Sequence, residues 1–398
     1  MDSYYRYTRA EISFDNLRHN LREFRRVLPP QIKIMAVLKA DAYGHGAVPM
    51  AREVLACGVD YLAVAFLDEA LELRRAGVDA PLLVLGYTAP EHVERAIQHD
   101  LTLTVYTREV LHRLKAARKS KPVKIHIKLD TGMGRIGIAD ESEAIHFIEE
   151  ALSAPGIDVE GLYTHYACAD EKDKSYTYAQ YEKFRRIISH FAAKDIHFPL
   201  NHAGNSATAI DIPGLALNMV RLGISMYGLY PSQEVNKKRV NLRPVMSFKT
   251  GIVMVKKTPS GTGISYGATY RTRGEETIAT LPVGYADGYT RMLSGKAHVL
   301  VHGQRVPVVG RICMDQCMIN VSRVPDVQIG DEVVLFGEQG GEMISADEVA
   351  SWLGTIGYEI VCMVSNRVPR VYVRNGQTVA TVNRLLSNVG DADDVRHV

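Results

Sequence analysis

Apolar residues along roughly the first 230 positions of the chain follow two alternating spacings. Stretches with an apolar residue every three or four positions predict helices, and the short continuous apolar runs between them predict buried strands. The first helical stripe follows Ser13 and contains Leu17, Leu21, Phe24 and Leu28. Further helices are expected at 46–56, 68–76, 91–98, 108–118, 142–152 and 178–193, and strands at 32–38, 61–66, 82–85, 101–105, 123–129, 159–165, 198–202 and 219–224.

About eight apolar runs separated by helices predict a (β/α)8 TIM-type barrel, because its parallel strands are covered on both faces. The alternative is a doubly wound open sheet. The glycine-rich G-x-G-x-x-G turn that would favour such a sheet does not follow the first predicted strand.

From about residue 240 the helical stripes give way to short alternating segments separated by glycine and proline. This pattern is typical of an antiparallel β domain. We therefore predict a barrel domain over 1–240, whose residues 8–13 pair with a β-strand-rich domain over 241–398. Strands are expected at 248–255, 277–281, 298–301, 306–309, 318–321 and 332–336, and one helix at 345–353.

The composition narrows the class of protein. The 398 residues include 47 Lys and Arg against 45 Asp and Glu, a formal net charge of +2 without a polybasic block, which argues against nucleic acid or a membrane surface as partner. The apolar runs are too short to span a bilayer, and Met1 to Glu11 has no secretory apolar core. Five scattered cysteines fit a reducing compartment, so a cytoplasmic location is expected.

Two cysteines, Cys313 and Cys317, have the separation of one helical turn. A second pair of cysteines or histidines, which a structural metal site requires, does not follow them. We therefore predict no metal site.

Lys39 is the first candidate for chemistry, because it directly follows the apolar run 32–38. In a barrel, reactive groups sit at the carboxyl ends of the strands. Desolvation there lowers the pKa of a lysine and frees its amine to form an imine. The alternative, a rim lysine paired with Asp41, stays open on position alone.

The segment Val37–Gly46, which reads VLKADAYGHG, resembles the pyridoxal-phosphate attachment signature of bacterial alanine racemases. The resemblance extends over nearly the whole chain and in the order of that family. It includes THYA at 164–167, Asn205-Ser206, RLGISMYG at 221–228, SYG at 265–267, GRICMD at 310–315, and Tyr358.

The resemblance implies pyridoxal 5'-phosphate as cofactor, a fold-type III enzyme, and a cofactor imine at Lys39. By the same resemblance Arg221 faces the pyridine nitrogen and is linked to His165. Because an arginine, with a pKa above about 12, keeps its proton, the ring nitrogen stays unprotonated and the cofactor is a weak electron sink. The residues that the resemblance implies for the phosphate site are Tyr43, Ser206, Gly223, Ile224 and Tyr358.

The implied reaction is the interconversion of L- and D-alanine by two bases acting on the external aldimine. Lys39 acts on the D-enantiomer and Tyr266 on the L-enantiomer, and Tyr266 is contributed by the other subunit of a homodimer. Two bases are the natural solution, because one base can hardly serve both faces of a planar intermediate. The resemblance further implies substrate binding by Arg135 and the N–H of Met314.

A carbamylated Lys128 is also implied, and its negative charge would orient Arg135 where a plain lysine would repel it. The expected product is D-alanine for peptidoglycan. Two alternatives are a racemase of broad amino-acid range and a non-catalytic pyridoxal-phosphate carrier. The carriers resemble a lone barrel, so residues 240–380 count against the second alternative.

Overall fold

The computed structural model describes residues 4–387. Its contacts divide the chain into two units. A barrel unit comprises 17–42 and 47–243, and a β-rich unit comprises the described parts of 1–16, 43–46 and 244–398. The predicted succession of a (β/α)8 barrel and an antiparallel-rich β domain is confirmed.

The barrel unit contains eight parallel strands in the order β8-β7-β6-β5-β4-β3-β2-β9. The ring is nearly closed, since β8 and β9 lie next to each other. The strand interiors are buried on both faces, as continuous apolar runs predict. The strands are β2 Lys33–Val37, β3 Tyr61–Val64, β4 Leu82–Val84, β5 Thr102–Val105, β6 Val123–Lys128, β7 Ile157–Tyr163, β8 Leu200–His202 and β9 Met219–Leu222.

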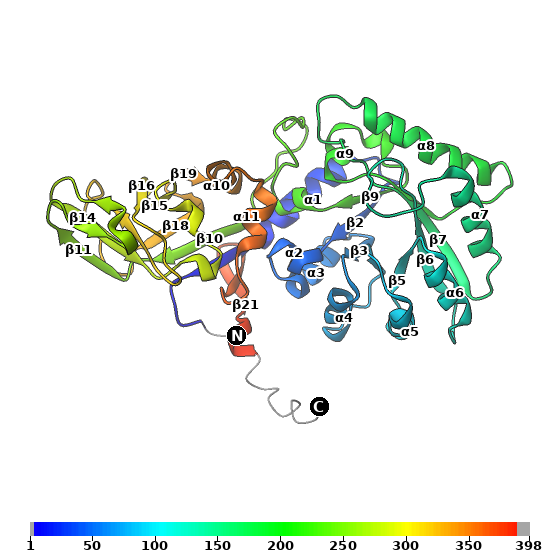
Figure 1. Ribbon diagram of the computed structural model, residues 1–398, viewed down its shortest axis with the longest axis horizontal. Coiled ribbons are helices and arrows are strands. Elements are labelled where there is room, and N and C mark those ends of the chain that lie inside the picture. Colours follow the sequence, from blue (N-terminus) through cyan, green and yellow to red (C-terminus); the bar gives the residue numbers. More distant parts are fainter. Residues whose placement is uncertain (1–3, 388–398) are drawn as a thin grey trace, which may run out of the picture. The chain divides into compact units, whose positions relative to one another are not determined.

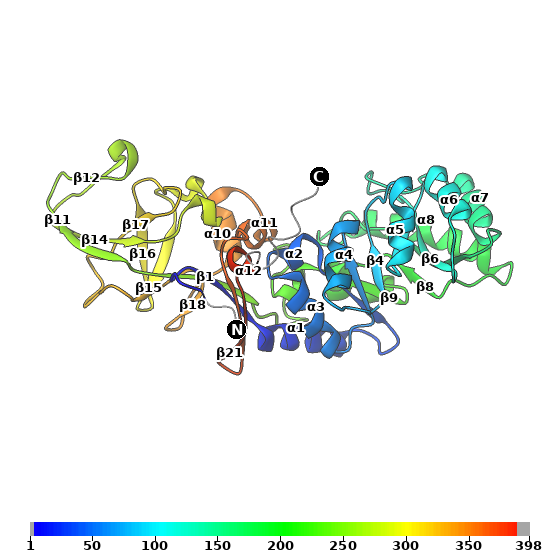
Figure 2. The same cartoon turned by 90° about the horizontal axis from the view of Figure 1, so that it is seen from below.

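Helices between the strands cover the outside of this sheet, as Figures 1 and 2 show for α4 to α8. Each helix turns an apolar stripe inward; in α6, for example, Val110, Leu111 and Leu114 are buried. The helices are α1 Phe14–Val27, α3 Ala47–Ala56, α4 Leu67–Arg75, α5 Val93–Gln98, α6 Arg108–Ala116, α7 Glu141–Leu152, α8 Ser175–Ala192 and α9 Ser206–Asp211.

A short left-handed turn, α2 (Lys39–Tyr43), directly follows the first barrel strand. Ala40, Asp41, Ala42 and Tyr43 have φ angles of 53°, 53°, 54° and 53°. Residues other than glycine rarely adopt this conformation, and a run of four is rarer still. The sequence did not predict this turn.

The β-rich unit is built on a sheet in the order β11-β14-β17-β16-β15-β18-β10-β1-β20-β21, with β19 paired to β18. The early strand β1 (Arg9–Ser13) lies between β10 and β20, antiparallel to the first and parallel to the second. The other strands are β10 Met246–Gly251, β11 Met254–Thr258, β12 Gly263–Ile264, β13 Tyr270–Arg271, β14 Glu276–Leu281, β15 His298–Val301, β16 Gln304–Val309, β17 Cys317–Asn320, β18 Glu332–Gln339, β19 Glu342–Ile344, β20 Arg370–Arg374 and β21 Gln377–Val382.

One expectation for this unit is wrong. The strand expected at 248–255 is the end of β10 and the start of β11, which have different partners, β18 and β14. Cys313 lies in a loop and Cys317 begins β17. The structure also adds α11 (Gly357–Met363) and α12 (Arg384–Ser387) to the expected helix, which is α10 (Ala346–Leu353).

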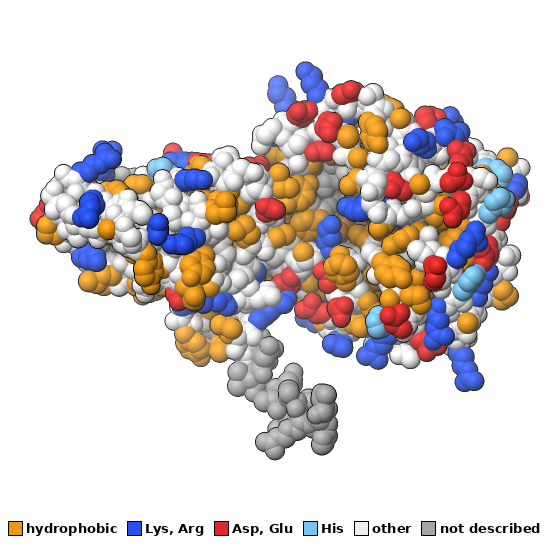
Figure 3. Space-filling view, in the orientation of Figure 1, with side chains coloured by type: hydrophobic (Ala, Val, Ile, Leu, Met, Phe, Trp, Pro, Cys, Tyr) orange, Lys and Arg blue, Asp and Glu red, His pale blue; other side chains and the backbone are white. Residues whose placement is uncertain are grey.

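Among residues 4–387, no helix combines the length and the apolar character needed to cross a bilayer. Figure 3 shows acidic and basic side chains interspersed over the face in view, in keeping with the balanced charge of the sequence.

Candidate active site

The barrel topology brings eight of the sequence-predicted residues to the carboxyl ends of the strands, the end where barrel enzymes carry their reactive groups. Lys39 follows β2, Lys128 ends β6 and Arg135 lies in the next loop. His165 follows β7, and Ser206 begins α9 after β8. Arg221 is on β9, and Gly223 and Ile224 follow it.

Arg221 is a buried cation, 4% exposed, whose hydrogen bonds fix its orientation. Its Nη1 donates to Nδ1 of His202 (2.8 Å) and to the His202 carbonyl (3.2 Å). Its Nη2 donates to the carbonyls of Thr164 (2.9 Å) and Ala203 (2.8 Å) and to Nδ1 of His165 (2.9 Å). Within residues 4–387 no acceptor is bound to Nε–H, so this one donor remains for a ligand.

Burial lowers the pKa of Arg221 to about 10, so the guanidinium stays charged at neutral pH. Burial, followed by the charge of Arg221, lowers the pKa of His165 well below its usual value. The imidazole of His165 is therefore neutral and can accept a hydrogen bond at Nδ1. The site pairs a fixed cation with a neutral imidazole.

A chain of hydrogen bonds continues from Arg221 into the barrel interior. Nε2 of His202 lies 2.8 Å from Nδ1 of His126, and Nε2 of His126 lies 3.1 Å from Glu160. Because Arg221 can only donate, Nδ1 of His202 must accept, and each imidazole passes its N–H toward the carboxylate. Tyr61 also donates to Glu160 (2.8 Å).

The charges along this chain follow from its surroundings. Burial lowers the pKa values of His126 and His202, so both imidazoles are neutral. Burial opposes ionisation of Glu160, but hydrogen bonds from His126, Lys124 and Tyr61 outweigh it and lower the pKa to about 2. Glu160 is thus an anion connected to the Arg221 cation through two neutral rings.

The loop after β9 lies next to the Ser206 hydroxyl. The hydroxyl of Ser206 accepts from the N–H groups of Gly223 (3.1 Å) and Ser225 (3.5 Å). Ser206 and Ile224 are both buried. A hydroxyl and backbone N–H groups are the donors that commonly hold a phosphate in barrels of this kind.

Lys128 is a buried amine, 3% exposed. Burial, assisted by the charge of Arg221, lowers its pKa to about 7. Its Nζ donates to the Leu129 carbonyl (2.8 Å) and lies 5.2 Å from the ring centre of Tyr163. At neutral pH a large share of this amine is unprotonated and therefore nucleophilic.

The loop that carries Arg135 is organised by one carboxylate. Asp130 Oδ1 accepts from the N–H groups of Gly132 (3.0 Å), Met133 (2.8 Å) and Gly134 (3.1 Å), and Oδ2 accepts from that of Arg135 (3.1 Å). Burial works against its ionisation, but these bonds lower the pKa of Asp130 overall. The Arg135 side chain is exposed.

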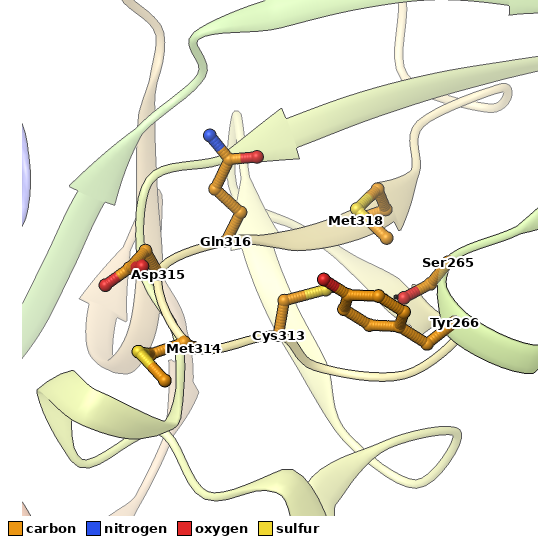
Figure 4. Close-up of a pocket in the computed structure, with 7 residues that line it drawn as sticks. All are labelled: Ser265, Tyr266, Cys313, Met314, Asp315, Gln316 and Met318. Atoms are coloured by element: carbon orange, nitrogen blue, oxygen red, sulfur yellow. Dashed lines mark hydrogen bonds between the residues drawn. The ribbon is translucent and has the colours of Figure 1, made fainter.

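Tyr266 belongs to the β-rich unit, and its side chain is 69% exposed. It lies beside an open pocket of about 490 Å³ lined by Ser265, Cys313, Met314, Asp315, Gln316 and Met318 (Figure 4). Ser265 and Ala268 have positive φ angles of 63° and 43°, and the Ser265 hydroxyl donates to the Arg311 carbonyl (2.6 Å). Strained backbone of this kind is concentrated at functional sites.

The loop with Met314 is anchored on both sides. The Met314 carbonyl accepts from the Ala286 N–H (3.1 Å). Fully buried Asp287 pairs with Arg367 (2.8 Å), which also reaches Asp315 (2.7 Å). The close approach here requires glycine at 284, since a Cβ atom would lie 2.3 Å from the Met314 carbonyl oxygen. Met314 is held in place while its side chain is 53% exposed.

Tyr43 and Tyr358 lie together in the β-rich unit, with their ring centres 6.2 Å apart. Tyr358 is on α11, a helix that the sequence did not predict. Burial, followed by the proximity of Tyr358, raises the pKa of Tyr43, so its phenol stays protonated. The predicted residues thus form two groups, one in each unit.

Sequence reasoning missed four side chains that organise the group in the barrel unit: His126, His202, Glu160 and Asp130. The first three are polar residues inside otherwise apolar strand runs, which is a signal that the sequence does contain. A polar side chain in a buried strand needs a partner, so such a residue points to an internal network. The particular partners depend on the strand order.

Two family models match the chain. The alanine racemase N-terminal domain matches residues 12–231, and the alanine racemase C-terminal domain matches residues 245–372. Among curated relatives, the alanine racemase of Methanococcus maripaludis is 50% identical and that of Desulforamulus reducens 49% identical. Each alignment spans 366 residues, 92% of this chain and 98% of the relative.

Solved structures give the same result. An alanine racemase from Clostridium difficile has a TM-score of 0.92 at 45% identity, covering 96% of this chain and 100% of that chain. The Bacillus anthracis alanine racemase, solved with bound L-Ala-P, has a TM-score of 0.90 at 44% identity, covering 96% and 99%.

Proposed function

The chain belongs to the alanine racemase family, and from this premise we propose that it interconverts L- and D-alanine with pyridoxal 5'-phosphate as cofactor. The reaction would take place in the cytoplasm and supply D-alanine for peptidoglycan. The observation that carries the proposal is the arrangement of Arg221. Its four terminal N–H groups are bound by protein acceptors, and its Nε–H remains available for a ring nitrogen.

The other donors fit the same cofactor. Lys39 would bind it through the amine, and Ser206, Gly223 and Ile224 would hold its phosphate. Tyr43 and Tyr358 would add two phenols to the phosphate site. When bound, the cofactor would supply the electron sink that lets the Cα proton of alanine leave. An arginine partner, which keeps its own proton, would make that sink a weak one.

Two groups would exchange the Cα proton on opposite faces of the substrate. Nζ of Lys39 would remove or return the proton of D-alanine, and Oη of Tyr266 that of L-alanine. The exposure of Tyr266 and Met314 supports a homodimer, in which each β-rich unit would serve the barrel of the other chain. Such a shared site makes dimerisation a condition of activity.

Arg135 and the N–H of Met314 would hold the substrate carboxylate. Lys128 would react with CO2, forming a carbamate and releasing a proton, since its lowered pKa leaves the amine free to attack. The carbamate would place a negative charge beside Arg135, where a protonated lysine would repel it. Intact-mass measurement in bicarbonate and in CO2-free buffer would detect this modification.

The test is the enantiomer ratio of L-alanine, L-serine and L-lysine incubated with the purified, cofactor-loaded protein. We expect alanine to racemise with the highest kcat/KM. Tyr266→Phe should lower racemisation by roughly a hundredfold or more and leave the visible absorbance of the bound cofactor intact. Tyr178→Phe, at another exposed tyrosine, is the control.

Equal kcat/KM values for lysine and alanine would instead support a broad-range racemase. Cofactor binding without racemisation of any amino acid would support a carrier protein. Either outcome would overturn the proposal.

A further inference from the structure

The left-handed turn after β2 starts at the residue next to Lys39. Ala40, Asp41 and Ala42 keep φ angles near 53° although none of them is glycine, so contacts outside the turn must stabilise it. One end of the turn is fixed by Asp41, whose Oδ1 accepts from the Ala47 N–H (2.7 Å).

The other end of the turn is bound by Glu69, in the first turn of α4. Glu69 Oε1 accepts from the Ala40 N–H at 2.6 Å. Its Oε2 accepts from the N–H groups of Ala65 (2.7 Å) and Phe66 (3.1 Å), which follow β3. A single carboxylate therefore connects the peptide after Lys39 to the end of the neighbouring strand.

Capping of α4 accounts for only part of this arrangement. The bonds from Ala65 and Phe66 satisfy donors at the start of α4, as a capping glutamate does. The bond from Ala40 contributes nothing to α4, because Ala40 belongs to another strand–turn connection. Through this bond the other carboxylate oxygen, Oε1, binds the turn next to Lys39.

We propose that Glu69 is a positioning residue for Lys39, which holds the left-handed turn in register with β3 and so sets the direction of the Lys39 amine. This inference rests on the proposed role of Lys39 as the cofactor lysine. A carboxylate suits the task because it only accepts, through two oxygens, and all three facing groups are N–H donors.

Glu69→Gln is the informative substitution, because it keeps the shape and removes one acceptor. The amide oxygen keeps more bonds at the place of Oε2, where it faces the N–H groups of Ala65 and Phe66, so the NH2 group meets the N–H donor of Ala40. Asp68→Asn is the matched control. Asp68 lies in the same first turn of α4 and is exposed, so its loss removes the same helix-terminal charge without these three bonds.

The first measurement is hydrogen–deuterium exchange of the cofactor-free protein. In Glu69→Gln, the segment 38–46 should exchange about tenfold faster than in the wild type, because the Ala40 amide loses its acceptor. The same segment should be unchanged in Asp68→Asn. This reading is independent of the cofactor and of any activity.

The second measurement is the kinetics of the loaded enzyme. Glu69→Gln should lower kcat for alanine about tenfold with a smaller change in KM, because a misdirected base slows proton transfer more than binding. Attachment of the cofactor to Lys39 should also be slower, and the visible absorbance of the bound cofactor measures this rate. Asp68→Asn should match the wild type in both respects.

Equal exchange and equal kcat in the two variants, with an equal loss of melting temperature, would overturn the inference and leave Glu69 as a helix cap. If Glu69→Gln does not fold, Glu69→Asp replaces it, because its shorter carboxylate can cap α4 but falls short of Ala40. A wild-type protein that does not racemise alanine would contradict the proposed function, while the exchange measurement would still judge the contact.

Discussion

At the scale of single residues, the site depends on buried groups whose charge is set by their neighbours. Arg221 stays a cation because burial lowers its pKa from the usual 12.5 only to about 10. Lys128, three strands away in the order of the barrel, starts from 10.5, and burial lowers its pKa to about 7, so it loses its proton near neutral pH. Two basic side chains in one barrel therefore carry different charges at the same pH.

Lys128 should make stability depend on pH. Its pKa falls from 10.5 to about 7 on folding, so between these values the unfolded chain holds a proton that the folded chain lacks. Stability must then rise with pH across this window. Lys128→Gln should flatten the rise in melting temperature between pH 7 and 10 in CO2-free buffer. Lys183→Gln, at an exposed lysine, is the control. Identical slopes of melting temperature against pH for wild type and Lys128→Gln would contradict the lowered pKa of Lys128.

Sequence patterns predicted candidate residues for the site but not their hydrogen-bond partners. Lys39 could be found because it ends an apolar strand, and Arg221 because it lies in a recognisable motif. The partners of Arg221 come from the last residue of β8 and from the residues that follow β7 and β8, distant from it in the sequence, so no local spacing predicts them. Side-chain networks depend on strand order, which a single sequence does not specify.

At the scale of elements, loops are held by single carboxylates that bind several backbone N–H groups. Asp130 does so for the loop after β6, and Glu69 for the turn after β2. Each arrangement fixes the backbone from which a candidate site residue, Lys39 or Arg135, projects. The loop conformation is therefore set before any substrate binds.

Asp130→Asn should loosen the loop that carries Arg135. The amide offers one acceptor oxygen where the carboxylate offers two, so at least one of four N–H groups loses its partner. We expect a loss of about 1–3 kcal/mol of stability and a several-fold rise in KM for alanine with a smaller change in kcat. Urea unfolding and steady-state kinetics measure the two effects. An unchanged KM would show that Arg135 does not bind the substrate, and Asp79→Asn, at an exposed carboxylate, is the control.

Local pattern predicted the barrel elements better than it predicted the β-rich unit. Strands buried on both faces, such as β2, stand out as apolar runs, and their helices have clear stripes. Between β10 and β11 the chain changes partners at Ile252 and Val253, two apolar residues without a glycine or proline between them, so the break left no signal. The left-handed turn contradicts the helix preference of its own alanines and depends on Glu69 instead.

At the scale of the whole molecule, the candidate residues are divided between two units of one chain. Lys39 and Arg221 belong to the barrel unit, and Tyr266 and Met314 to the β-rich unit. The proposed homodimer would bring each group to the complementary group of the other chain. That arrangement predicts that two differently inactivated chains can restore activity to each other.

Mixing Lys39→Ala with Tyr266→Phe protein should restore racemisation. After unfolding and joint refolding, half of the dimers contain one chain of each kind, and one of the two sites in such a dimer has both bases. The specific activity should therefore approach about a quarter of the wild-type value. Each variant refolded alone is the control. No recovery, with mixed dimers demonstrated by mass, would place both bases of a site in one chain.

The single uncommitted N–H of Arg221 also has a consequence for inhibitor design. Because the other donors are bound within the protein, the guanidinium cannot rotate to suit a new ligand without breaking several bonds. A planar compound that binds next to the Arg221 Nε–H must present a lone pair to it. An analogue with carbon at that ring position would leave the buried donor without an acceptor. Replacing that one ring nitrogen by C–H is thus the smallest chemical change expected to separate tight binders from weak ones.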